Sequence, residues 1–216
     1  MADSGRGIVI FGDVLDSRAD AVGSAAWLRH LSGDLDAVYG PARQAEFGFT
    51  QGDELQGLLD EGADPLLAVL RAALDPGARP MRWAIVAGAV NPGAGPATER
   101  TGAAFLQARA AVTKARAERD GLVLASGDPA SDAVLSDLGP VLAVLLADLT
   151  ERQREIVRGI VVEGLRQADV ADRLGISRPT VSVAVGRARL REIVRLAAAI
   201  RTLFGRGVAA AGGGPS

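Results

Sequence analysis

The pattern of apolar residues changes at Asp128, and this change constrains the fold more than any other feature of the sequence. Before Asp128, short apolar runs typical of β-strands alternate with helical patterns, and after it every pattern is helical to about residue 204. A chain of 216 residues is long enough for one ordinary domain and a smaller one. We therefore predict an α/β domain over 1–127, connecting helices over 128–148 with a break at Gly139 and Pro140, a smaller helical domain over 149–206 and a disordered tail over 207–216. Thr150 and Gln153 would form a capping box at the start of a helix of the smaller domain.

The first part of the chain shows the order strand, helix, hairpin, helix, strand, helix, strand. Its first strand, GIVIF at 7–11, is an uninterrupted apolar run, as expected for a strand covered on both faces. This order predicts an α/β layer in which helices pack against a mixed sheet. The later segments are a hairpin at 44–50 and 55–60, a helix that begins at Asp64 and Pro65, a strand at 79–90, a loop at 91–101, a helix at about 102–118 and a strand in GLVLASG.

The second part of the chain contains the pattern of a helix-turn-helix in QADVADRLGISRPTVSVAVGRARL, residues 167–190. Ala171 is small where two helices cross closely, and Gly175 lies at the turn, where a positive φ is needed. Ser177 is placed to cap the second helix, and Pro179 to begin it. Apolar residues at helical spacing would hold the helices together: Val170, Leu174, Ile176, Val181 and Ala184.

One face of the second helix is left outward by this arrangement and would enter the major groove of DNA. The alternative is a helical hairpin that serves only dimerisation or partner docking. The motif resembles region four of sigma factors and the DNA-binding domains of response regulators over about residues 149–196. The predicted DNA-contacting residues are Ser177, Arg178, Thr180, Ser182, Val183 and Arg187, with Arg189, Arg191 and Arg195 suited to phosphates.

Charge is distributed unevenly between the two parts. Residues 148–216 contain twelve arginines and seven acidic residues, whereas the rest of the chain contains twelve basic and nineteen acidic residues. The basic end predicts a polyanionic partner. A homodimer is expected, because one small recognition helix rarely gives enough affinity and paired half-sites suit a two-fold protein.

Two acidic segments in the first part point to a metal site. Asp13 follows the first strand, and Asp53 and Glu54 lie at the predicted hairpin tip after Gly52, which can take the positive φ of a tight turn. If the hairpin lies beside the first strand, Asp13 and Asp53 would share a magnesium ion held against the phosphates of a nucleotide. The alternative is that Asp13 ends a strand and Asp53 forms a turn, with no ligand.

The segments FGDVLDS, TQGDELQGLL, MRWAIVAGAV and GAAFLQARAAV together resemble the SatD family of bacterial proteins. They also follow the same order as landmarks of class III nucleotide cyclases and GGDEF cyclases. The resemblance spans about residues 7–126 and implies a ferredoxin-like, cyclase-like palm with Asp13 and Asp53 as metal ligands and Glu54 as the second acid. A class III cyclase would carry asparagine and arginine at helical spacing, whereas Leu106, Gln107 and Arg109 are out of step. This departure implies metal and nucleotide binding without turnover.

Several other polar residues allow a choice between a structural and a binding role. Asp16, Ser17 and Arg18 precede the first helix, where they would cap it or, at its positive end, contact a nucleotide phosphate. Capping is the interpretation that we favour. The remaining expectations are solvated helix faces for Arg109, Lys114 and Arg116, a surface or boundary position for His30, and core positions for Trp27 and Trp83.

Composition excludes several classes of protein. The absence of cysteine and the single histidine exclude disulfide frameworks, thiolate metal sites and multi-histidine zinc centres. We find no signal-peptide pattern, and the longest apolar run, 139–147, is too short to cross a bilayer. We therefore predict a cytoplasmic protein that does not enter the membrane.

These observations lead to three functional hypotheses. The first is a bacterial DNA-binding transcription regulator whose cyclase-like domain senses a ligand, such as a nucleotide with magnesium. The second is a nucleotide cyclase or related nucleotidyltransferase that uses Asp13 and Asp53 as metal ligands. The third is a non-catalytic oligomerisation scaffold.

Overall fold

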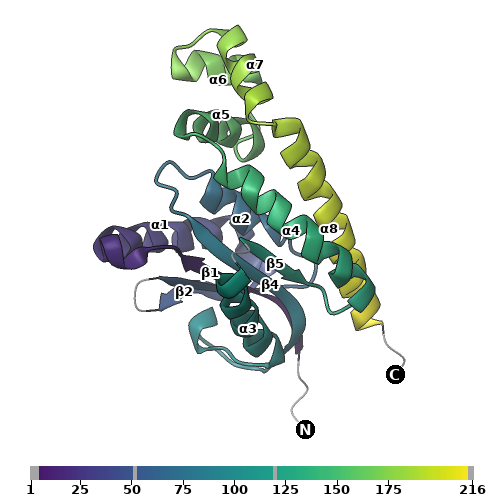
Figure 1. Cartoon of the computed structure of the whole chain (residues 1–216). Helices are drawn as coiled ribbons and strands as arrows, with labels where there is room; N and C mark the ends of the chain where they lie inside the picture. The colour runs from purple at the N-terminus through teal and green to yellow at the C-terminus, as the bar shows by residue number, and fades with distance from the viewer. Residues whose placement is uncertain (1–4, 51–52, 119–120, 214–216) are drawn as a thin grey trace.

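The computed structural model describes residues 5–50, 53–118 and 121–213 (Figure 1). These residues contain a five-stranded sheet with the strand order β2-β3-β1-β4-β5. β1 is antiparallel to β3 and β4, and β5 is parallel to β4, so the sheet is mixed, as predicted. The strands are β1 (Gly5–Val14), β2 (Arg43–Thr50), β3 (Glu54–Leu59), β4 (Met81–Val90) and β5 (Leu122–Ala125).

The central strand, β1, is buried on both faces. Ile8 and Ile10 point into one hydrophobic core, and the alternate residues Val9 and Phe11 point into another on the opposite face. This division follows from the two-residue period of a strand. The apolar run at 7–11 is therefore uninterrupted because both faces of this strand are covered, as predicted.

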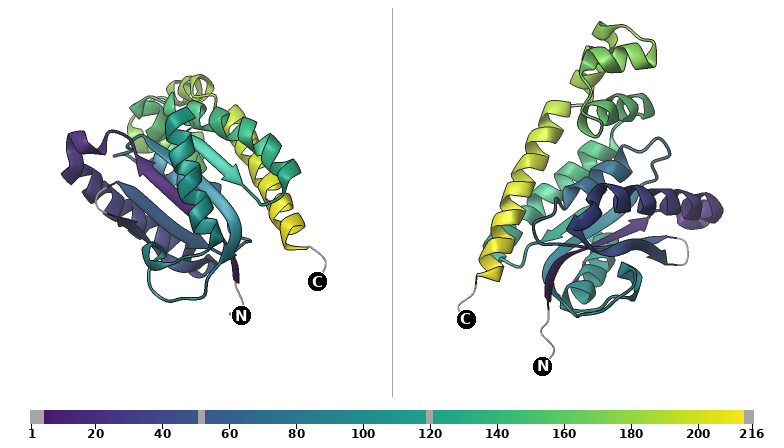
Figure 2. Two further views of the ribbon diagram at one scale, coloured as in Figure 1. Left: turned by 60° about the horizontal axis from the view of Figure 1, so that its bottom comes forward. Right: turned by 180° about the vertical axis from the view of Figure 1, so that it is seen from behind.

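Helices cover both faces of the sheet, as two views show (Figure 2). The face of Ile8 and Ile10 is covered by α1 (Ala21–Tyr39) and α2 (Leu66–Ala73), and the other face by α3 (Ala103–Glu118). The first four strands with α1 and α2 form the β-α-β-β-α-β order of a ferredoxin-like fold, which confirms the predicted fold class. Three short 3₁₀ helices complete this part: η1 (Ser17–Asp20), η2 (Gly40–Ala42) and η3 (Ala97–Glu99).

Two long helices, α4 (Pro129–Ala147) and α8 (Leu190–Gly212), pack against each other and join the two parts of the chain (Figure 1). Leu142 of α4 and Phe204 of α8 are almost completely buried in the same hydrophobic core as Ile8 and Ile10. The helices after Asp128 therefore share a core with the sheet.

The sequence prediction was wrong about the glycines of α4 and α8. α4 continues through Gly139 and Pro140, where a break was expected, and α8 continues to Gly212 within the expected disordered tail. A side chain at Gly139 would lie 2.6 Å from the carbonyl oxygen of Leu122 in β5, and one at Gly207 would collide with Ser126. These glycines allow close packing of helices.

The helix-turn-helix lies at the end of the molecule away from the sheet (Figure 1). It consists of α5 (Glu151–Val161), α6 (Gln167–Leu174) and α7 (Arg178–Arg187). Thr150 and Gln153 form a reciprocal capping box at the start of α5, as predicted. α8 then returns the chain from this motif to the sheet.

The length argument against a membrane-spanning segment was also wrong. α4 is long and apolar enough to cross a membrane by length and composition, because the helix does not break at Gly139. However, Leu135, Leu142 and Leu146 belong to the core shared with the sheet. One side of α4 therefore packs against this core, and 28% of its apolar stretch is buried.

Candidate nucleic-acid interface and the acidic edge of the sheet

The turn between α6 and α7 has the backbone geometry that the sequence predicts. Gly175 has a φ of 63°, in the left-handed region that favours glycine. The next N–H, that of Ile176, donates to the carbonyl oxygen of Ala171 at 3.0 Å. The hydroxyl of Ser177 accepts a hydrogen bond from the N–H of Thr180 at 3.3 Å and thereby caps α7.

A small hydrophobic cluster holds the three helices of the motif together. The residues buried in this cluster are Val170 and Ala171 of α6, Val181 of α7 and Ile156 of α5. The sequence analysis did not identify Ile156, because it lies outside the two-helix pattern. Partly buried residues complete the cluster: Ile160, Leu165, Leu174, Ile176, Ala184 and Val185. All five apolar residues predicted from helical spacing are therefore present.

The outward face of α7 is exposed along its whole length. Val181 is the buried residue of this helix, so α7 contacts the rest of the protein along one narrow line. Val183 exposes 53% of its surface although it is apolar. The exposed residues include each predicted DNA-contacting position of this segment: Ser177, Arg178, Thr180, Ser182, Val183 and Arg187.

The predicted phosphate-contacting residues Arg189, Arg191 and Arg195 are also exposed, next to α7. Arg189 has a φ of 51°, a conformation that costs a non-glycine residue about 1–2 kcal/mol. Its N–H donates to the carbonyl oxygen of Gly186 at 3.1 Å at the bend between α7 and α8. The sequence carries no signal for this strain. Arg189 therefore holds its cation beside α7 in a strained backbone conformation.

Other arginines of the motif are engaged within the protein. Arg166 donates to Asp169 at 3.1 Å, and this hydrogen bond is the largest reason why the pKa of Asp169 is lowered. Arg158 and Arg173 both pair with Glu163. These acidic partners within the motif distinguish the three arginines from the outward arginines of α7.

The predicted acidic residues converge at one edge of the sheet. Asp13 lies directly opposite Glu54 in the pairing of β1 with β3. The N–H of Val14 donates to the backbone carbonyl of Asp53 at 2.9 Å. The hairpin therefore lies beside the first strand, as predicted, whereas Gly52 is outside the described residues.

Arginines of α3 and β4 pair with these carboxylates. Arg116 donates to the buried carboxylate of Asp13 at 2.7 Å, and Arg82 lies 3.8 Å from the same oxygen. Arg109 lies 3.4 Å from Glu54. The hydrogen bond with Asp13 is the main cause of the raised pKa of Arg116. Arg109 and Arg116 lie on an exposed face of α3, as predicted, with 63% of each side chain exposed. Their acidic partners were not predicted, because no local pattern reveals partners 55 and 103 residues away.

This arrangement does not fit the predicted magnesium ion. One carboxylate oxygen of Asp13 and one of Glu54 accept from guanidinium groups, and Gln56 also donates to the same oxygen of Glu54 at 2.6 Å. Within residues 5–50, 53–118 and 121–213, no group of three or more His, Cys, Asp or Glu side chains is arranged to hold a metal ion. Cations so close to the carboxylates repel a second cation. The shared magnesium ion remains a prediction, and we derive no step through it.

The three residues before the first helix do not cap it. Asp20 does so instead, because its carboxylate accepts from the N–H of Gly23 at 2.9 Å. Ser17 donates to Asp53 at 3.1 Å and so joins the acidic edge, whereas Asp16 and Arg18 are exposed. The predicted contacts of Asp16, Ser17 and Arg18 with a nucleotide stay predictions.

Two ion pairs, which the sequence analysis missed, connect the sheet with the C-terminal helices. Asp64 accepts from Arg201 of α8 at 2.8 Å and from the N–H of Leu66, which caps α2. Asp75 accepts from Trp27 at 3.0 Å and lies 3.7 Å from Arg158 of α5. The helix-turn-helix is thus attached to the sheet by charge as well as by the shared core.

Comparison with known protein families finds one match. Residues 141–191 match the family described as "Sigma-70, region 4". This segment contains the end of α4, the three helices of the motif and the start of α8. The match confirms that part of the chain is a sigma-like helix-turn-helix, which indicates a DNA-binding regulatory role. It covers less than half of the chain. The resemblance to the SatD family remains a prediction.

Among the solved structures that match this chain, two are described as a bacterial light-regulated adenylyl cyclase. Each is 14% identical to this chain and has a TM-score of 0.41. The matched region covers 57% of this chain and 44% of each of these structures. The chain thus spans less than half the length of these structures. A likeness of this degree does not identify an activity. No curated protein matches the chain.

Proposed function

We propose that this protein is a cytoplasmic transcription regulator that inserts α7 into the major groove of DNA. The single observation that carries this proposal is the exposure of every predicted contact residue on the outward face of α7. The match of the surrounding segment to Sigma-70 region 4 and the excess of arginine after residue 148 support it.

The outward residues of α7 divide into two chemical groups. Thr180 and Ser182 offer hydroxyls that hydrogen-bond to base edges, and the methyl groups of Val183 suit the methyl group of thymine. Arg178 and Arg187 lie at the two ends of the helix, where they would bind phosphates and fix the register. We therefore assign sequence reading to the middle of α7 and positioning to its ends.

We also propose that the protein binds DNA as a homodimer. α4 exposes two apolar side chains outside any cavity lining, Val134 and Val141, with exposed fractions of 47% and 51%. Apolar residues gathered on one helix suit contact with the same helix of a second copy. A two-fold dimer would place two α7 helices on half-sites about 34 Å apart.

The decisive experiment is selection of bound duplexes from a random DNA pool, followed by affinity measurements on the selected sequence. The variant Arg178→Ala/Arg187→Ala should bind at least about tenfold more weakly at low salt, and the slope of log K against log salt should fall by about two. Arg29→Ala, which removes an exposed arginine from α1, is the matched control. Failure to enrich any sequence, or equal affinity of the two variants, would contradict the proposal.

A cavity on the α3 face favours a nucleotide as the ligand of the sheet domain. This cavity has a volume of about 520 Å³ and includes Gln56, Asn91, Thr98, Arg100 and Arg109 in its lining. Arg100 has a buried Nε without a hydrogen-bond partner. We propose that Arg100 binds a phosphate group there and that the amides contact the base or sugar.

Nucleoside triphosphates, with and without magnesium or manganese, test this second proposal and the enzyme hypothesis together. Binding should raise the melting temperature of the wild-type protein, and the rise should be lost in Arg100→Met. A nucleotide product that disappears in Asp13→Ala would instead support a cyclase. A melting temperature that no nucleotide changes would favour the scaffold hypothesis.

A further inference from the structure

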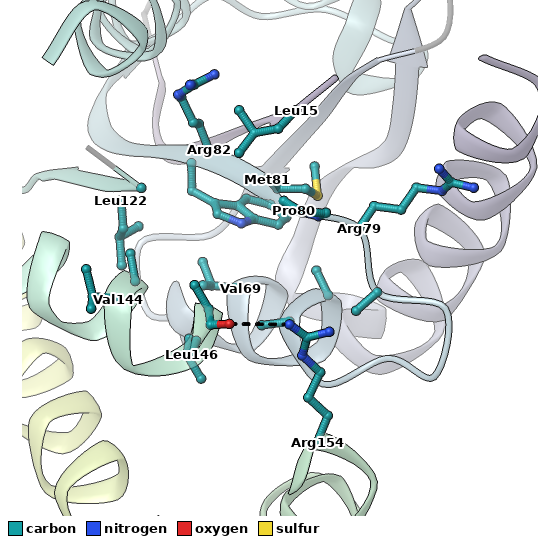
Figure 3. Close-up of a pocket in the computed structure, with 17 residues that line it drawn as sticks. Leu15, Val69, Arg79, Pro80, Met81, Arg82, Leu122, Val144, Leu146 and Arg154 are labelled. Atoms are coloured by element: carbon teal, nitrogen blue, oxygen red, sulfur yellow. Dashed lines mark hydrogen bonds between the residues drawn. The ribbon is translucent and has the colours of Figure 1, made fainter. Parts of the chain in front are cut away.

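A second cavity lies where the sheet meets the helices that carry the helix-turn-helix (Figure 3). Its volume is about 280 Å³. The walls come from α2, the start of β4, the end of α4 and one residue of α5. This cavity shares no lining residue with the cavity on the α3 face, and it borders the acidic edge only through Arg82.

The lining combines apolar walls with positive charge. The apolar walls of the cavity include Val69, Trp83, Leu122 and Val144. Val144 exposes 58% of its surface. The lining residues include three arginines and no acidic residue. An apolar cavity with an unbalanced positive charge complements a molecule that is both apolar and anionic.

The three arginines of the lining differ in their partners. Arg79 donates to Asp20 at 2.6 Å, and Arg82 lies 3.8 Å from Asp13, so both have acidic partners outside the cavity. Figure 3 shows their side chains directed away from the centre of the cavity. Neither of these arginines is therefore the binding group.

Arg154 projects from α5 into the cavity (Figure 3). Its Nη2 reaches only the carbonyl oxygen of Ala147, at a long 3.5 Å, and its Nε is buried without a hydrogen-bond partner. A buried donor that lacks an acceptor is unfavourable in the empty cavity. A carboxylate could accept two hydrogen bonds from this guanidinium in a parallel arrangement.

We propose that this cavity binds a small amphipathic anion, a carboxylate with a short apolar body. The carboxylate binds Arg154, and the apolar body lies between Trp83, Leu122 and Val144. The volume is just below the range of about 300–1,000 Å³ that is typical for drug-sized ligands, which suits a short hydrocarbon chain or a single aromatic ring.

The cavity also has a position from which a ligand can act on the helix-turn-helix. Arg154 belongs to α5, the first helix of the motif. The segment before β4 contributes Ala78 and Arg79 to the cavity wall, and nearby Asp75 lies 3.7 Å from Arg158 of α5. A ligand would therefore contact both sides of the junction. This coupling, unlike binding itself, rests on the proposed DNA-binding function.

Calorimetric titration of the full chain at pH 7 with octanoate, octanol and octylammonium tests the site. Octanoate should bind, octanol should bind about tenfold or more weakly, and octylammonium should not bind measurably. Equal affinity for octanoate and octanol, or no binding of octanoate, overturns the proposal.

Three variants locate the bound anion. Arg154→Met keeps the apolar stem of the side chain and should weaken octanoate binding about tenfold or more, with little effect on octanol. Arg152→Met, on the exposed side of the same helix, should leave both affinities unchanged. Val144→Asp changes an exposed residue of the wall and should also weaken octanoate binding. Wild-type affinity in Arg154→Met or Val144→Asp would place the anion elsewhere and overturn the proposal.

The affinity for the selected DNA duplex, measured with and without saturating octanoate, tests the coupling. The affinity should change in the wild-type protein and not in Arg154→Met. An unchanged affinity in the wild-type protein overturns the coupling. Because the calorimetric titration contains no DNA, failure of the DNA-binding proposal can be distinguished from failure of the cavity proposal.

Discussion

The outward face of α7 and the acidic edge of the sheet are both clusters of charged residues, and they differ in what surrounds the charge. Arg178 and Arg187 of α7 are exposed to solvent. At the sheet edge, Asp13 and Glu54 are paired with Arg116 and Arg109 of α3. The comparison teaches that a charged cluster is available to a ligand only where the fold leaves it without an internal partner.

The largest expected effect tests whether the two regions fold as one unit. Phe204→Ala removes a side chain that is 1% exposed in the core shared by α8 and the sheet. The free energy of unfolding should fall by about 3–5 kcal/mol. Fluorescence and far-UV circular dichroism should then report one coincident transition in urea. Two separate transitions would show that the regions are independent domains.

The next effect tests the internal pairing of the acidic edge. Arg116→Met leaves the buried carboxylate of Asp13 with Arg82 as its remaining cationic partner. Unfolding free energy should fall by about 1–2 kcal/mol, less than for a fully buried pair, because the Arg116 side chain is 63% exposed. The same urea titration of Arg178→Ala should show a change within about 0.5 kcal/mol. Equal losses in the two variants would remove the distinction between the clusters.

A smaller effect separates stability from DNA binding at the bend after α7. Arg189→Gly should raise the unfolding free energy by about 0.5 kcal/mol, because glycine adopts the φ of 51° without strain. It should also weaken DNA binding and reduce the salt slope by about one. Chemical denaturation and a salt series on the selected duplex measure the two quantities. Unchanged DNA affinity would restrict the role of Arg189 to the fold.

The smallest effect concerns pH. Hydrogen bonds from Arg166 lower the pKa of Asp169 below the usual range of an aspartate in the folded protein. The contribution of Asp169 to stability should therefore be complete above about pH 3.9 and should be lost as the pH falls through the lower folded pKa. The difference in unfolding free energy between the wild-type protein and Asp169→Asn should shrink over this range. A difference that is constant down to pH 2 would contradict this assignment.

Local signals in the sequence predicted most of the elements and the helix-turn-helix. The capping box of Thr150 and Gln153, the turn at Gly175 and the cap at Ser177 all depend on residues within a few positions of each other. Such signals can be recognised without knowledge of the fold. The same reasoning failed for Gly139 and Gly207, because a glycine that permits close packing looks like a glycine that ends a helix.

The candidate sites were only partly predictable. Hydrophobic periodicity indicated which side of α7 faces solvent, and the order of strands brought Asp13 beside Asp53. The arginines that pair with the acids and the unpaired Arg154 in the second cavity had no local pattern. These contacts depend on the positions of helices far away in the chain.

The sequence by itself determined most of the secondary-structure elements, the change to helices after Asp128, and the outward residues of α7, because each follows from periodicity and short-range hydrogen bonds. Only the tertiary structure decided which charges are paired, which glycines are packed and where α8 meets the sheet. These outcomes depend on contacts such as that of Asp64 with Arg201, which are 137 residues apart. The energy of a charge depends on its surroundings, and the folded chain creates those surroundings.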